Sequence, residues 1–513
     1  MAWFEEAVFY HIYPLGLLGA PEHNDHGEPV HRLRELHPWI THIRELGCNA
    51  LYIGPLFSSG THGYDTSDYR KVDERLGDNE DLSAFVRECH EQGIRVILDA
   101  VFNHTGREFF AFQDILQYRE NSRYRNWYRI DFSRNNSYND GLRYENWGGH
   151  DLLVKLNMHE PEVRNYLLDV VREWVNVYDI DGLRLDAADV LDFGFMQELR
   201  RTADEVKPEF WLMGEVIHGE YTRWVNDHTL HAVTDYALHK ALYSGHNDHN
   251  YFEIAHTVRR TLQSGMRHLY NFADNHDTER IMTRLHEKAN WYPLHILLYT
   301  LPGIPSLYYG SEYGIEGRKE RYSDASLRPR IDLAQMQEND CLRFLQALGT
   351  IRRKETALVY GDYEELHLTT GQFAFRRGDI IITVNNEEHP ADIPAKAGNG
   401  TYTGAISGRE CMARDGHMQV HLEGNSGEIW IPEGRTYTPV KITPPKTAEK
   451  KPAPEPQRYT GPAKSYEEMT VEELQAEILA KMAKNGPVNE QMKKSVLDNI
   501  WHDSLVNWVK SFR

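Results

Sequence analysis

Cysteine, basic charge and long apolar runs are all scarce in this chain of 513 residues. The four cysteines, Cys48, Cys89, Cys341 and Cys411, lie far apart and form no CxxC pair, which argues against a disulfide scaffold or a zinc cluster. No run approaches the roughly 18 apolar residues of a membrane helix. The start, MAWFEEAVFYHIYP, has Glu5 and Glu6 where a signal peptide has its apolar segment. These features predict a soluble, cytoplasmic protein with no membrane partner.

Acidic residues outnumber basic ones by 77 to 57, which gives a formal net charge of −20 at pH 7. A surface of this sign repels phosphate backbones and anionic lipids, so nucleic acids are not expected partners. Hydrophobic residues make up 40% of the chain and aromatic residues 11%. This composition suits a large core and also suits surfaces that stack on neutral ligands such as sugars.

Short β-rich runs alternate with helical segments over about the first two-thirds of the chain. Helices are expected over 82–92 and over 162–178, the second entered through Pro161. Eight such alternations are typical of a (β/α)8 TIM barrel, although doubly wound sheets share the pattern. The predicted strands are 7–13, 50–53, 95–102, 182–186, 211–215, 232–236, 268–273 and 306–309.

Changes in composition divide the chain into five expected parts. The stretch between the third strand and its helix is too long for a structureless loop in a compact domain, so it predicts an inserted domain. A later region alternates apolar and polar residues between Gly and Asn turns, which predicts an antiparallel β-sandwich. The parts are the catalytic barrel (1–104 and 158–355), the inserted domain (105–157), the C-terminal β domain (356–440), a Pro- and Lys-rich linker (441–465) and a helical appendage (466–513).

The helical appendage begins with a capping-box signal, Thr470 followed by Glu473. An apolar stripe over 471–482 is broken at 486–487, and a second stripe covers 488–508. Two interpretations stay open. The helices pack on themselves or on the body, or they form a module for homo-oligomerisation or for docking a partner.

Polar residues follow the predicted strands at their carboxyl ends, where (β/α)8 barrels place their active sites. A single Asp at such a position is more often a helix N-cap than a catalyst. Here Asp186, Glu215 and Asp277 converge on one mouth together with cationic and imidazole groups. These companions are Arg184, His104 and His276, with Asp99 and Asn103 on the third strand.

Two of these carboxylates suit glycoside hydrolysis, in which one attacks the anomeric carbon and the other protonates the leaving oxygen. Arg184 and Asp186 share one face of a strand, so the guanidinium is expected to lower the pKa of Asp186. Glu215 follows apolar residues that are expected to raise its pKa. The residues therefore predict Asp186 as nucleophile and Glu215 as acid/base, which leaves Asp277 to bind sugar hydroxyls.

The sequence resembles the alpha-amylase family of glycoside hydrolases in motifs that span about residues 7–335. Their order and spacing are highly specific. The motifs are HGYDTSDY (62–69), DAVFNH (99–104), VKLN (154–157), GLRLDAAD (182–189), GEV (214–216), FADNHD (272–277) and PGIPSLYYGSE (302–312).

The resemblance implies retaining enzymes on a barrel with an inserted B domain and a β-sandwich C domain. It implies Asp186 as nucleophile, Glu215 as acid/base and Asp277 as the stabiliser of the transition state. It places His104, His276 and Arg184 at the −1 sugar or its carboxylates and Tyr64 under that sugar. It also points to Asp324 and Arg328 as an Asp/Arg pair at the −2 and −3 sugars, although SDASLRP (323–329) departs from the usual wording there.

Within the family, VKLN and GEVIH (214–218) resemble the neopullulanase and cyclomaltodextrinase branch. That branch acts on short maltooligosaccharides, cyclodextrins or pullulan, and the likeness adds His218 to the expected substrate-binding residues. The branch usually carries an N-terminal β domain, whereas this chain starts at the first barrel strand. It also usually has Trp after GE[IV], where this chain has Ile217. One aromatic platform at the +1 sugar is therefore expected to be missing.

Many members of the family bind a structural calcium ion between the barrel and the B domain. The resemblance assigns its ligands to the Asn of the DAVFNH motif and to a His just after the nucleophile motif. Asn103 is present, but Val190 stands where the His is expected. No calcium is therefore predicted at that site and no other cofactor is expected, and a structural calcium ion is kept as the alternative.

Three functions are compatible with these motifs to different degrees. The first is hydrolysis of α-1,4 bonds in maltodextrins and related α-glucan oligosaccharides. The second is a transglycosylase or isomerase, such as a 4-α-glucanotransferase or a trehalose-forming enzyme, which uses the same glycosyl-enzyme. The third is a non-catalytic binding relative, which the three intact carboxylates argue against.

Overall fold

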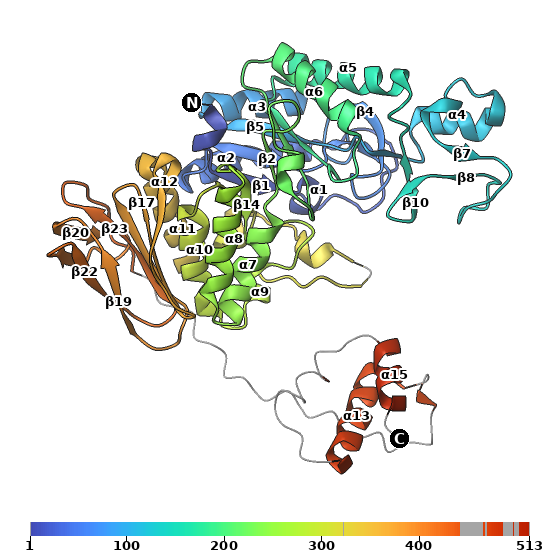
Figure 1. The fold of residues 1–513 in the computed structure, drawn as a ribbon. Helices are drawn as coiled ribbons and strands as arrows, with labels where there is room; N and C mark the ends of the chain where they lie inside the picture. Colours follow the sequence, from blue (N-terminus) through green and yellow to red (C-terminus); the bar gives the residue numbers. More distant parts are fainter. Residues whose placement is uncertain are drawn as a thin grey trace. The chain divides into compact units, whose positions relative to one another are not determined.

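The computed structural model describes residues 2–321, 323–441, 465–466, 469–485, 496 and 502–511. The chain forms two compact units, Met1–Pro445 and Lys446–Arg513 (Figure 1). Each unit is described by itself below.

The first unit is built on a parallel barrel, which confirms the predicted fold class. Its eight strands follow the spatial order β13-β12-β11-β5-β2-β1-β15-β14. The two ends of this order meet where Thr234 pairs in parallel with Tyr270 and where Asp235 N–H donates to the Tyr270 carbonyl at 2.9 Å. The strands are β1 (Phe9–Ile12), β2 (Ala50–Ile53), β5 (Arg95–Ala100), β11 (Gly182–Leu185), β12 (Trp211–Gly214), β13 (Ala232–Val233), β14 (Tyr270–Phe272) and β15 (Ile304–Tyr308).

Helices between the strands form the outer layer of the barrel (Figure 1). The helix α3 starts at a capping box. The Asp78 side chain accepts a hydrogen bond from the Asp81 backbone N–H, and the Asp81 side chain accepts one from the Asp78 backbone N–H. The helix α5 starts at Pro161, whose missing N–H costs nothing at that position. The main helices are α2 (His37–Glu45), α3 (Asn79–Glu91), α5 (Pro161–Tyr178), α6 (Phe193–Val206), α7 (Tyr236–Asn247), α8 (Tyr251–Gln263), α10 (Trp291–Thr300) and α11 (Asp340–Lys354).

The segment between β5 and α5 folds as short antiparallel elements. The strand β10 (His150–Lys155) pairs with β6 (His104–Gly106) on one side and with β9 (Asn146–Trp147) on the other. A helix, α4 (Phe110–Tyr118), and a small pair of strands, β7 (Ile130–Asp131) and β8 (Arg143–Tyr144), complete the segment. It lies at the right-hand edge of Figure 1.

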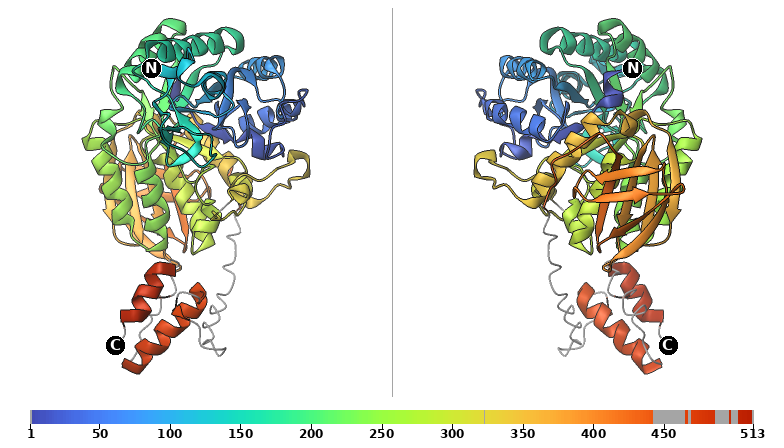
Figure 2. Two further views of the ribbon diagram at one scale, coloured as in Figure 1. Left: turned by 90° about the vertical axis from the view of Figure 1, so that its right-hand side faces the viewer. Right: turned by 90° about the vertical axis from the view of Figure 1, so that its left-hand side faces the viewer.

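The C-terminal strands form two antiparallel sheets that enclose a shared apolar cluster. Six strands follow the order β16-β17-β18-β23-β20-β21, and β19 pairs with β22 separately. Ile381, Ile393, Val420 and Trp430 are buried together between the sheets. The helix α10 contacts β18 and β23 and is buried on every side, and Figure 2 shows these orange strands beside the green helices. The strands are β16 (Tyr363–Leu368), β17 (Gln372–Arg377), β18 (Ile380–Asn385), β19 (Ala391–Lys396), β20 (Gly400–Gly404), β21 (Glu410–Ala413), β22 (His417–Leu422) and β23 (Ser426–Pro432).

The second unit contains α13 (Val471–Asn485) and α15 (His502–Ser511). The predicted capping box is present, because Thr470 N–H donates to Glu473 Oε2 at 2.8 Å and Glu473 N–H donates to Thr470 Oγ1 at 3.2 Å. Side chains of both helices share one buried apolar cluster, which includes Ile478, Leu505 and Val509. The predicted break at 486–487, most of the linker 441–465 and much of the second stripe lie outside the described residues.

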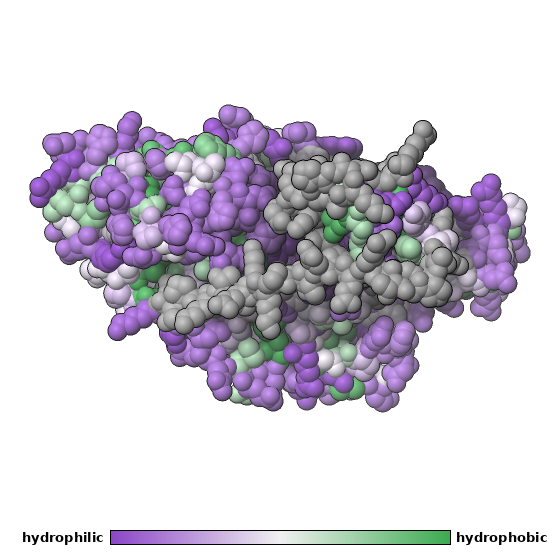
Figure 3. Space-filling view, turned by 90° about the horizontal axis from the view of Figure 1, so that it is seen from below, coloured by the Kyte–Doolittle hydropathy of each residue, from purple (hydrophilic) through white to green (hydrophobic). Residues whose placement is uncertain are grey.

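The surface gives no sign of a membrane-spanning element within the described ranges. No helix there combines the length and the apolar character that a bilayer crossing requires. Hydrophilic residues dominate the coloured part of the face in Figure 3, and hydrophobic residues form small separate groups on it.

Candidate active site

A cavity of about 470 Å³ opens at the carboxyl ends of the barrel strands. Seven of the ten predicted site residues line it directly: Tyr64, His104, Asp186, Glu215, Asp277, Asp324 and Arg328. Arg184 and His276 do not line it but are buried in contact with residues that do. His218 is exposed and is not part of the lining.

Asp186 directly follows β11, and the backbone beyond it is held in an unusual conformation. Its N–H donates to the Ala100 carbonyl at 3.1 Å, so pairing with β5 continues past the strand end. Ala187 then adopts φ of +52°, which costs a residue with a Cβ about 1–2 kcal/mol. The Ala187 N–H donates to Glu215 Oε2 at 3.2 Å. This turn therefore connects the two predicted catalytic carboxyls.

Arg184 lies at the centre of the site's electrostatics. Its Nη1 is 2.9 Å from Asp99 Oδ1 and 3.1 Å from Asp186 Oδ1, and its Nη2 is 2.8 Å from Glu215 Oε1. Burial alone would lower the pKa of the Arg184 guanidinium, but Asp99 and Glu215 outweigh burial and hold that pKa above its usual range. The guanidinium therefore stays charged and holds three carboxyl groups together.

The expectation of a depressed pKa for Asp186 is wrong. Burial raises the pKa of the Asp186 carboxyl well above its usual range, and the neighbouring Glu215 and Asp99 add to the rise. Arg184 opposes the rise but is shared among the three carboxyls. One cation against three acidic groups favours retention of a proton in the cluster, and that proton belongs to the group of interacting carboxyls as a whole.

Glu215 follows β12 and meets polar groups instead of the expected apolar surface. Leu212 and Met213 are fully buried in the barrel wall. The carboxyl itself contacts the Arg184 guanidinium, the Ala187 N–H and the Tyr236 hydroxyl, which donates to Oε1 at 3.3 Å. Three donors therefore fix the orientation of the Glu215 carboxyl.

Asp277 follows β14 and lies between two cationic or imidazole groups. His276 Nε2 is 3.0 Å from Asp277 Oδ2, and Arg328 Nη2 is 2.9 Å from Oδ1. Burial raises the pKa of the Asp277 carboxyl, but His276 and Arg328 outweigh burial and hold it well below its usual range. Asp277 is therefore an ionised carboxylate. The predicted pair is also present, since Arg328 Nη2 is 3.3 Å from Asp324 Oδ2.

Tyr64 lies in the turn between β3 (Phe57–Ser59) and β4 (Thr66–Val72) and forms a wall of the cavity. Its hydroxyl donates to Asp99 Oδ2 at 2.9 Å and lies 2.5 Å from His276 Nε2, with the two rings nearly parallel. His104 Nε2 is 3.1 Å from the Tyr64 carbonyl and 3.9 Å from Asp186 Oδ2. Burial lowers the pKa of His104 to about 3, so His104 is a neutral donor beside Asp186.

Several lining residues were not predicted from the sequence. Trp147 and His150 come from the β9–β10 hairpin, and their rings stack at 6.1 Å. Tyr236 begins α7, and Lys319 Nζ donates to the Asp277 carbonyl at 3.1 Å. These residues stand outside the recognised motifs, and no local pattern in the sequence places them near Asp186.

The candidate calcium ligand Asn103 is buried, and its side-chain amide lies 3.2 Å from His104 Nδ1. Among the described residues, one group of His, Asp and Glu side chains is close enough to share a metal ion, namely His31, Asp78 and Asp81. These acids already serve the capping box of α3, and Asp81 pairs with Arg34 at 2.7 Å. The group is explained by these contacts.

Comparisons with known proteins agree with this geometry. Residues 33–356 match the family model described as alpha amylase, catalytic domain. A cyclomaltodextrinase from a Bacillus species is 31% identical over 441 residues, which cover 79% of this chain and 77% of that protein. Neopullulanase 2 from Thermoactinomyces vulgaris is 30% identical over 461 residues, which cover 83% and 78%.

A solved cyclomaltodextrinase structure superimposes with a TM-score of 0.75 at 27% identity, covering 84% of this chain and 78% of that one. The family match includes the strands that carry Asp186, Glu215 and Asp277. The chain therefore belongs to the alpha-amylase family and is an α-glucan glycoside hydrolase.

Proposed function

We propose that the protein hydrolyses α-1,4-glucosidic bonds of maltooligosaccharides with retention of configuration, through a covalent glycosyl-enzyme. The observation that carries the proposal is the sharing of one buried guanidinium, that of Arg184, by the carboxyls of Asp186 and Glu215. Retaining glycosidases need two closely spaced carboxyls. The names of the relatives, which include cyclomaltodextrinase and neopullulanase, support an α-glucan substrate.

The reaction needs one proton distributed over the two carboxyls, and the cluster around Arg184 favours that state. Ionised Asp186 attacks the anomeric carbon while Glu215 gives its proton to the glycosidic oxygen, which leaves as a hydroxyl on the aglycone. Glu215, now ionised, then takes a proton from water as the water attacks the glycosyl–Asp186 ester. Asp186 is released as a carboxylate, and Glu215 is protonated again.

The remaining residues hold the sugar that reacts. Ionised Asp277, fixed by His276 and Arg328, offers both oxygens to sugar hydroxyls and to the positive charge that develops at the anomeric carbon. His104 presents a neutral imidazole next to Asp186. The ring of Tyr64 gives the sugar a flat apolar surface.

The cavity fits a short segment of glucan, and its size is in the range of ordinary ligand pockets. Maltodextrins taken up by a cell are soluble substrates of this length. We therefore propose a cytoplasmic enzyme that degrades them, in line with the name of one relative, an intracellular maltogenic amylase from Bacillus subtilis.

A product time course tests the substrate assignment. The purified full chain is incubated with maltotriose to maltoheptaose, β-cyclodextrin, pullulan and soluble starch, and products are resolved by chromatography. If the enzyme hydrolyses these substrates, short oligomers yield glucose and maltose. Proton NMR is expected to show that the α-anomer is released first. Products longer than the substrate would show that the glycosyl group is transferred to another sugar instead of to water. Initial release of the β-anomer would contradict retention of configuration.

The variant Asp186→Asn tests the assigned nucleophile. We expect turnover to fall by at least about 10³-fold, because an amide cannot form the glycosyl ester. Binding of maltotriose, followed by calorimetry, is expected to persist. Asp169→Asn, at an exposed position of α5, is the matched control and keeps full turnover. Turnover of Asp186→Asn at the level of this control would contradict the assignment.

A further inference from the structure

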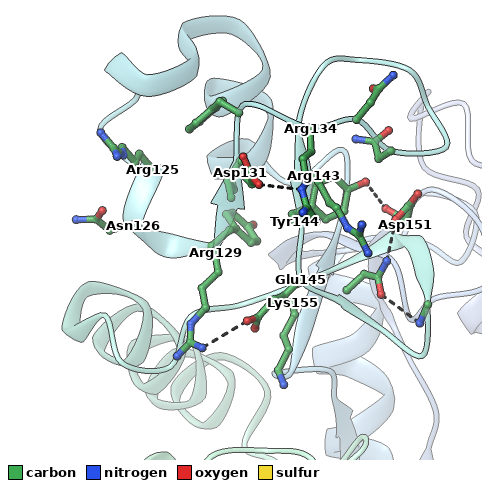
Figure 4. A pocket seen from close by; sticks show the side chains of 17 residues that line it. Arg125, Asn126, Arg129, Asp131, Arg134, Arg143, Tyr144, Glu145, Asp151 and Lys155 are labelled. Carbon is green, nitrogen blue, oxygen red and sulfur yellow. Dashed lines mark hydrogen bonds and ion pairs between the residues drawn. The ribbon is translucent and has the colours of Figure 1, made fainter.

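A second and larger cavity, of about 1120 Å³, lies on the segment between β5 and α5 (Figure 4). Its lining is contributed by residues between Arg125 and Lys155, and it shares no lining residue with the catalytic cavity. In Figure 4, Arg125 and Asn126 lie on one side and Arg143 and Asp151 on the other. We refer to this space as the outer cavity.

The outer cavity is rich in basic residues although the chain as a whole carries a net charge of −20. Five cations line it, against three acids. The cations are Arg125, Arg129, Arg134, Arg143 and Lys155, and the acids are Asp131, Glu145 and Asp151. This local excess runs against the composition, so it is not explained by a generally basic surface.

The three acids are satisfied within the wall itself. Glu145 lies 3.4 Å from Arg129 Nη1, and Asp131 lies 3.5 Å from Arg134 Nε. Asp151 accepts from the Ser137 hydroxyl at 2.6 Å and from Asn146 Nδ2 at 2.8 Å. Two of the acids are therefore ion-paired, whereas Asp151 is hydrogen-bonded but keeps its negative charge, so the five cations and three acids of the lining leave a net charge of +2.

Three cations of the lining, Arg125, Arg143 and Lys155, have no ion-pair partner within 4.0 Å among the described residues. Unpaired guanidinium and ammonium groups that surround one concavity attract an anion, and guanidinium binds phosphate oxygens with two parallel hydrogen bonds. The charge pattern therefore fits a phosphate group better than a neutral sugar.

The size and the rest of the lining indicate more than an isolated ion. The volume of about 1120 Å³ is slightly above the roughly 300–1,000 Å³ of ordinary small-molecule sites, so the cavity has room for a sugar phosphate. The side-chain amide of Asn126 has no partner among the described residues and can reach hydroxyl groups. The half-buried Ile130 and Phe132 add apolar surface, against which the C–H face of a sugar ring can pack.

We propose that the outer cavity binds a phosphorylated sugar, with the phosphate held by Arg143 and Lys155 and the sugar held by the apolar residues and by Asn126, which lies with Arg125 on the other side of the cavity. The site is separate from catalysis, because the two cavities share no lining residue. The strand β10 contributes to both, with Asp151 and Lys155 in the outer cavity and His150, Leu152 and Leu153 in the catalytic one. A maltooligosaccharide and the phosphorylated sugar therefore bind at the same time.

Calorimetric titration of the inactive Asp186→Asn chain tests the proposal, since binding is read without turnover. The probes are glucose 6-phosphate, inorganic phosphate and glucose, at constant ionic strength. We expect glucose 6-phosphate to bind, inorganic phosphate to bind at least tenfold more weakly, and glucose not to bind at the outer cavity. Saturation with maltotriose is expected to leave the affinity for glucose 6-phosphate unchanged.

Two substitutions locate the bound ligand. Arg143→Gln and Lys155→Gln are each expected to weaken glucose 6-phosphate binding at least tenfold while leaving the melting temperature unchanged. Arg201→Gln removes an equally exposed guanidinium from α6 and is expected to have no effect.

Three results would overturn the proposal. The first is the absence of glucose 6-phosphate binding, or binding that Arg143→Gln and Lys155→Gln do not weaken. The second is competition by maltotriose, which would move the ligand to the catalytic cavity. The third is equal affinity for inorganic phosphate, which would reject the sugar part. None of these results depends on whether the proposed hydrolysis is correct.

Discussion

Trp147 supplies an aromatic surface in the cavity where Ile217 offers none. The sequence predicted a missing platform because Ile217 replaces the usual Trp after the GEV motif. Both residues line the catalytic cavity, and Trp147 is 38% exposed there. Its ring lies 6.0 Å from that of His104, within reach of a sugar bound beside Asp186. An exposed indole in such a place is available for stacking on glucose rings.

Replacement of Trp147 by Ala is therefore expected to raise KM for maltotriose about threefold to tenfold, in line with the about 0.5–1.5 kcal/mol of an aromatic contact. The effect on kcat is expected to be smaller. Steady-state kinetics on maltotriose and maltopentaose measure both constants. Trp147→Phe keeps a flat ring and serves as the conservative variant. Equal KM in Trp147→Ala and in the unmodified chain would show that the ring does not contact substrate.

The predicted roles of single residues depended on the order of the motifs, and the pKa values of these residues depended on contacts between motifs that their order does not show. The sequence placed Arg184 beside Asp186 and expected a lower pKa. The fold adds Asp99 and Glu215 to the same guanidinium and buries all of them, which reverses the direction for Asp186. His218 was expected at the substrate through its place after Glu215, yet the chain turns there and exposes it.

At the scale of elements, the end of β12 needs a residue without a side chain. A Cβ on Gly214 would lie 2.4 Å from Leu230 Cδ1 and 2.7 Å from Ala188 Cβ. Ala188 belongs to the turn after Asp186, and Leu230 precedes β13. The close approach of these elements therefore fixes the carboxyls of both catalytic strands relative to each other.

Substitution of Gly214 by Ala is expected to destabilise the chain by about 1–3 kcal/mol, the usual range for overpacking. Because Glu215 is the next residue, kcat is expected to fall more than KM changes. Urea unfolding and steady-state kinetics measure the two effects. Gly398→Ala is the control, since the nearest atom to its Cβ is the Tyr402 hydroxyl oxygen at 3.6 Å. An unchanged kcat in a destabilised Gly214→Ala variant would show that the close packing at Gly214 supports stability but does not position Glu215 for catalysis.

Regular periodicity explains which elements could be predicted. The barrel strands and the helices over 82–92 and 162–178 were found because apolar residues repeat along them. The walls of the outer cavity were not found, because β7, β8 and β9 have two residues each and cannot show a period. For the same reason Trp147 and His150, far from Asp186 along the chain, could not be assigned to the catalytic cavity from the sequence.

At the scale of the whole molecule, every residue proposed for catalysis or substrate binding lies in the first compact unit. The helices of the second unit bury an apolar cluster of their own. Removal of residues 446–513 is therefore expected to leave kcat and KM for maltotriose within about twofold. Kinetics of the truncated and full chains measure this. A large loss of turnover in a truncated chain that still melts cooperatively would assign the second unit a part in catalysis.

Buried histidines contribute to the pH dependence of stability of the first unit. Burial lowers the pKa of His104 to about 3 and lowers those of His239, His246 and His295 to about 4. In the unfolded chain each imidazole has a pKa near 6.5. The unfolded state therefore takes up protons between pH 6.5 and 4 that the folded state does not bind. The contribution of these histidines to stability is complete above pH 6.5 and declines as the pH falls toward 4.

His295 offers a clean test of this dependence. It is fully buried, its Nδ1–H donates to the Trp291 carbonyl at 2.7 Å, and its Nε2 has no hydrogen-bond partner among the described residues. His295→Phe keeps a ring against Trp291 but cannot bind a proton. Between pH 7 and pH 4.5 its unfolding free energy is expected to drop by about 2 kcal/mol less than that of the unmodified chain.

Urea unfolding at pH 7, 6, 5 and 4.5 measures the drop, and exposed His256→Gln on α8 is the control that keeps the original slope. The comparison separates the effect of the imidazoles from that of carboxylates such as Asp181. Burial raises the pKa of Asp181, but His90 and a backbone hydrogen bond outweigh burial and hold this pKa at about 2. Asp181 therefore loses its contribution to stability only below pH 4. Parallel slopes for His295→Phe and the unmodified chain would mean that His295 gains a proton without unfolding, and the acid sensitivity would then belong to the carboxylates.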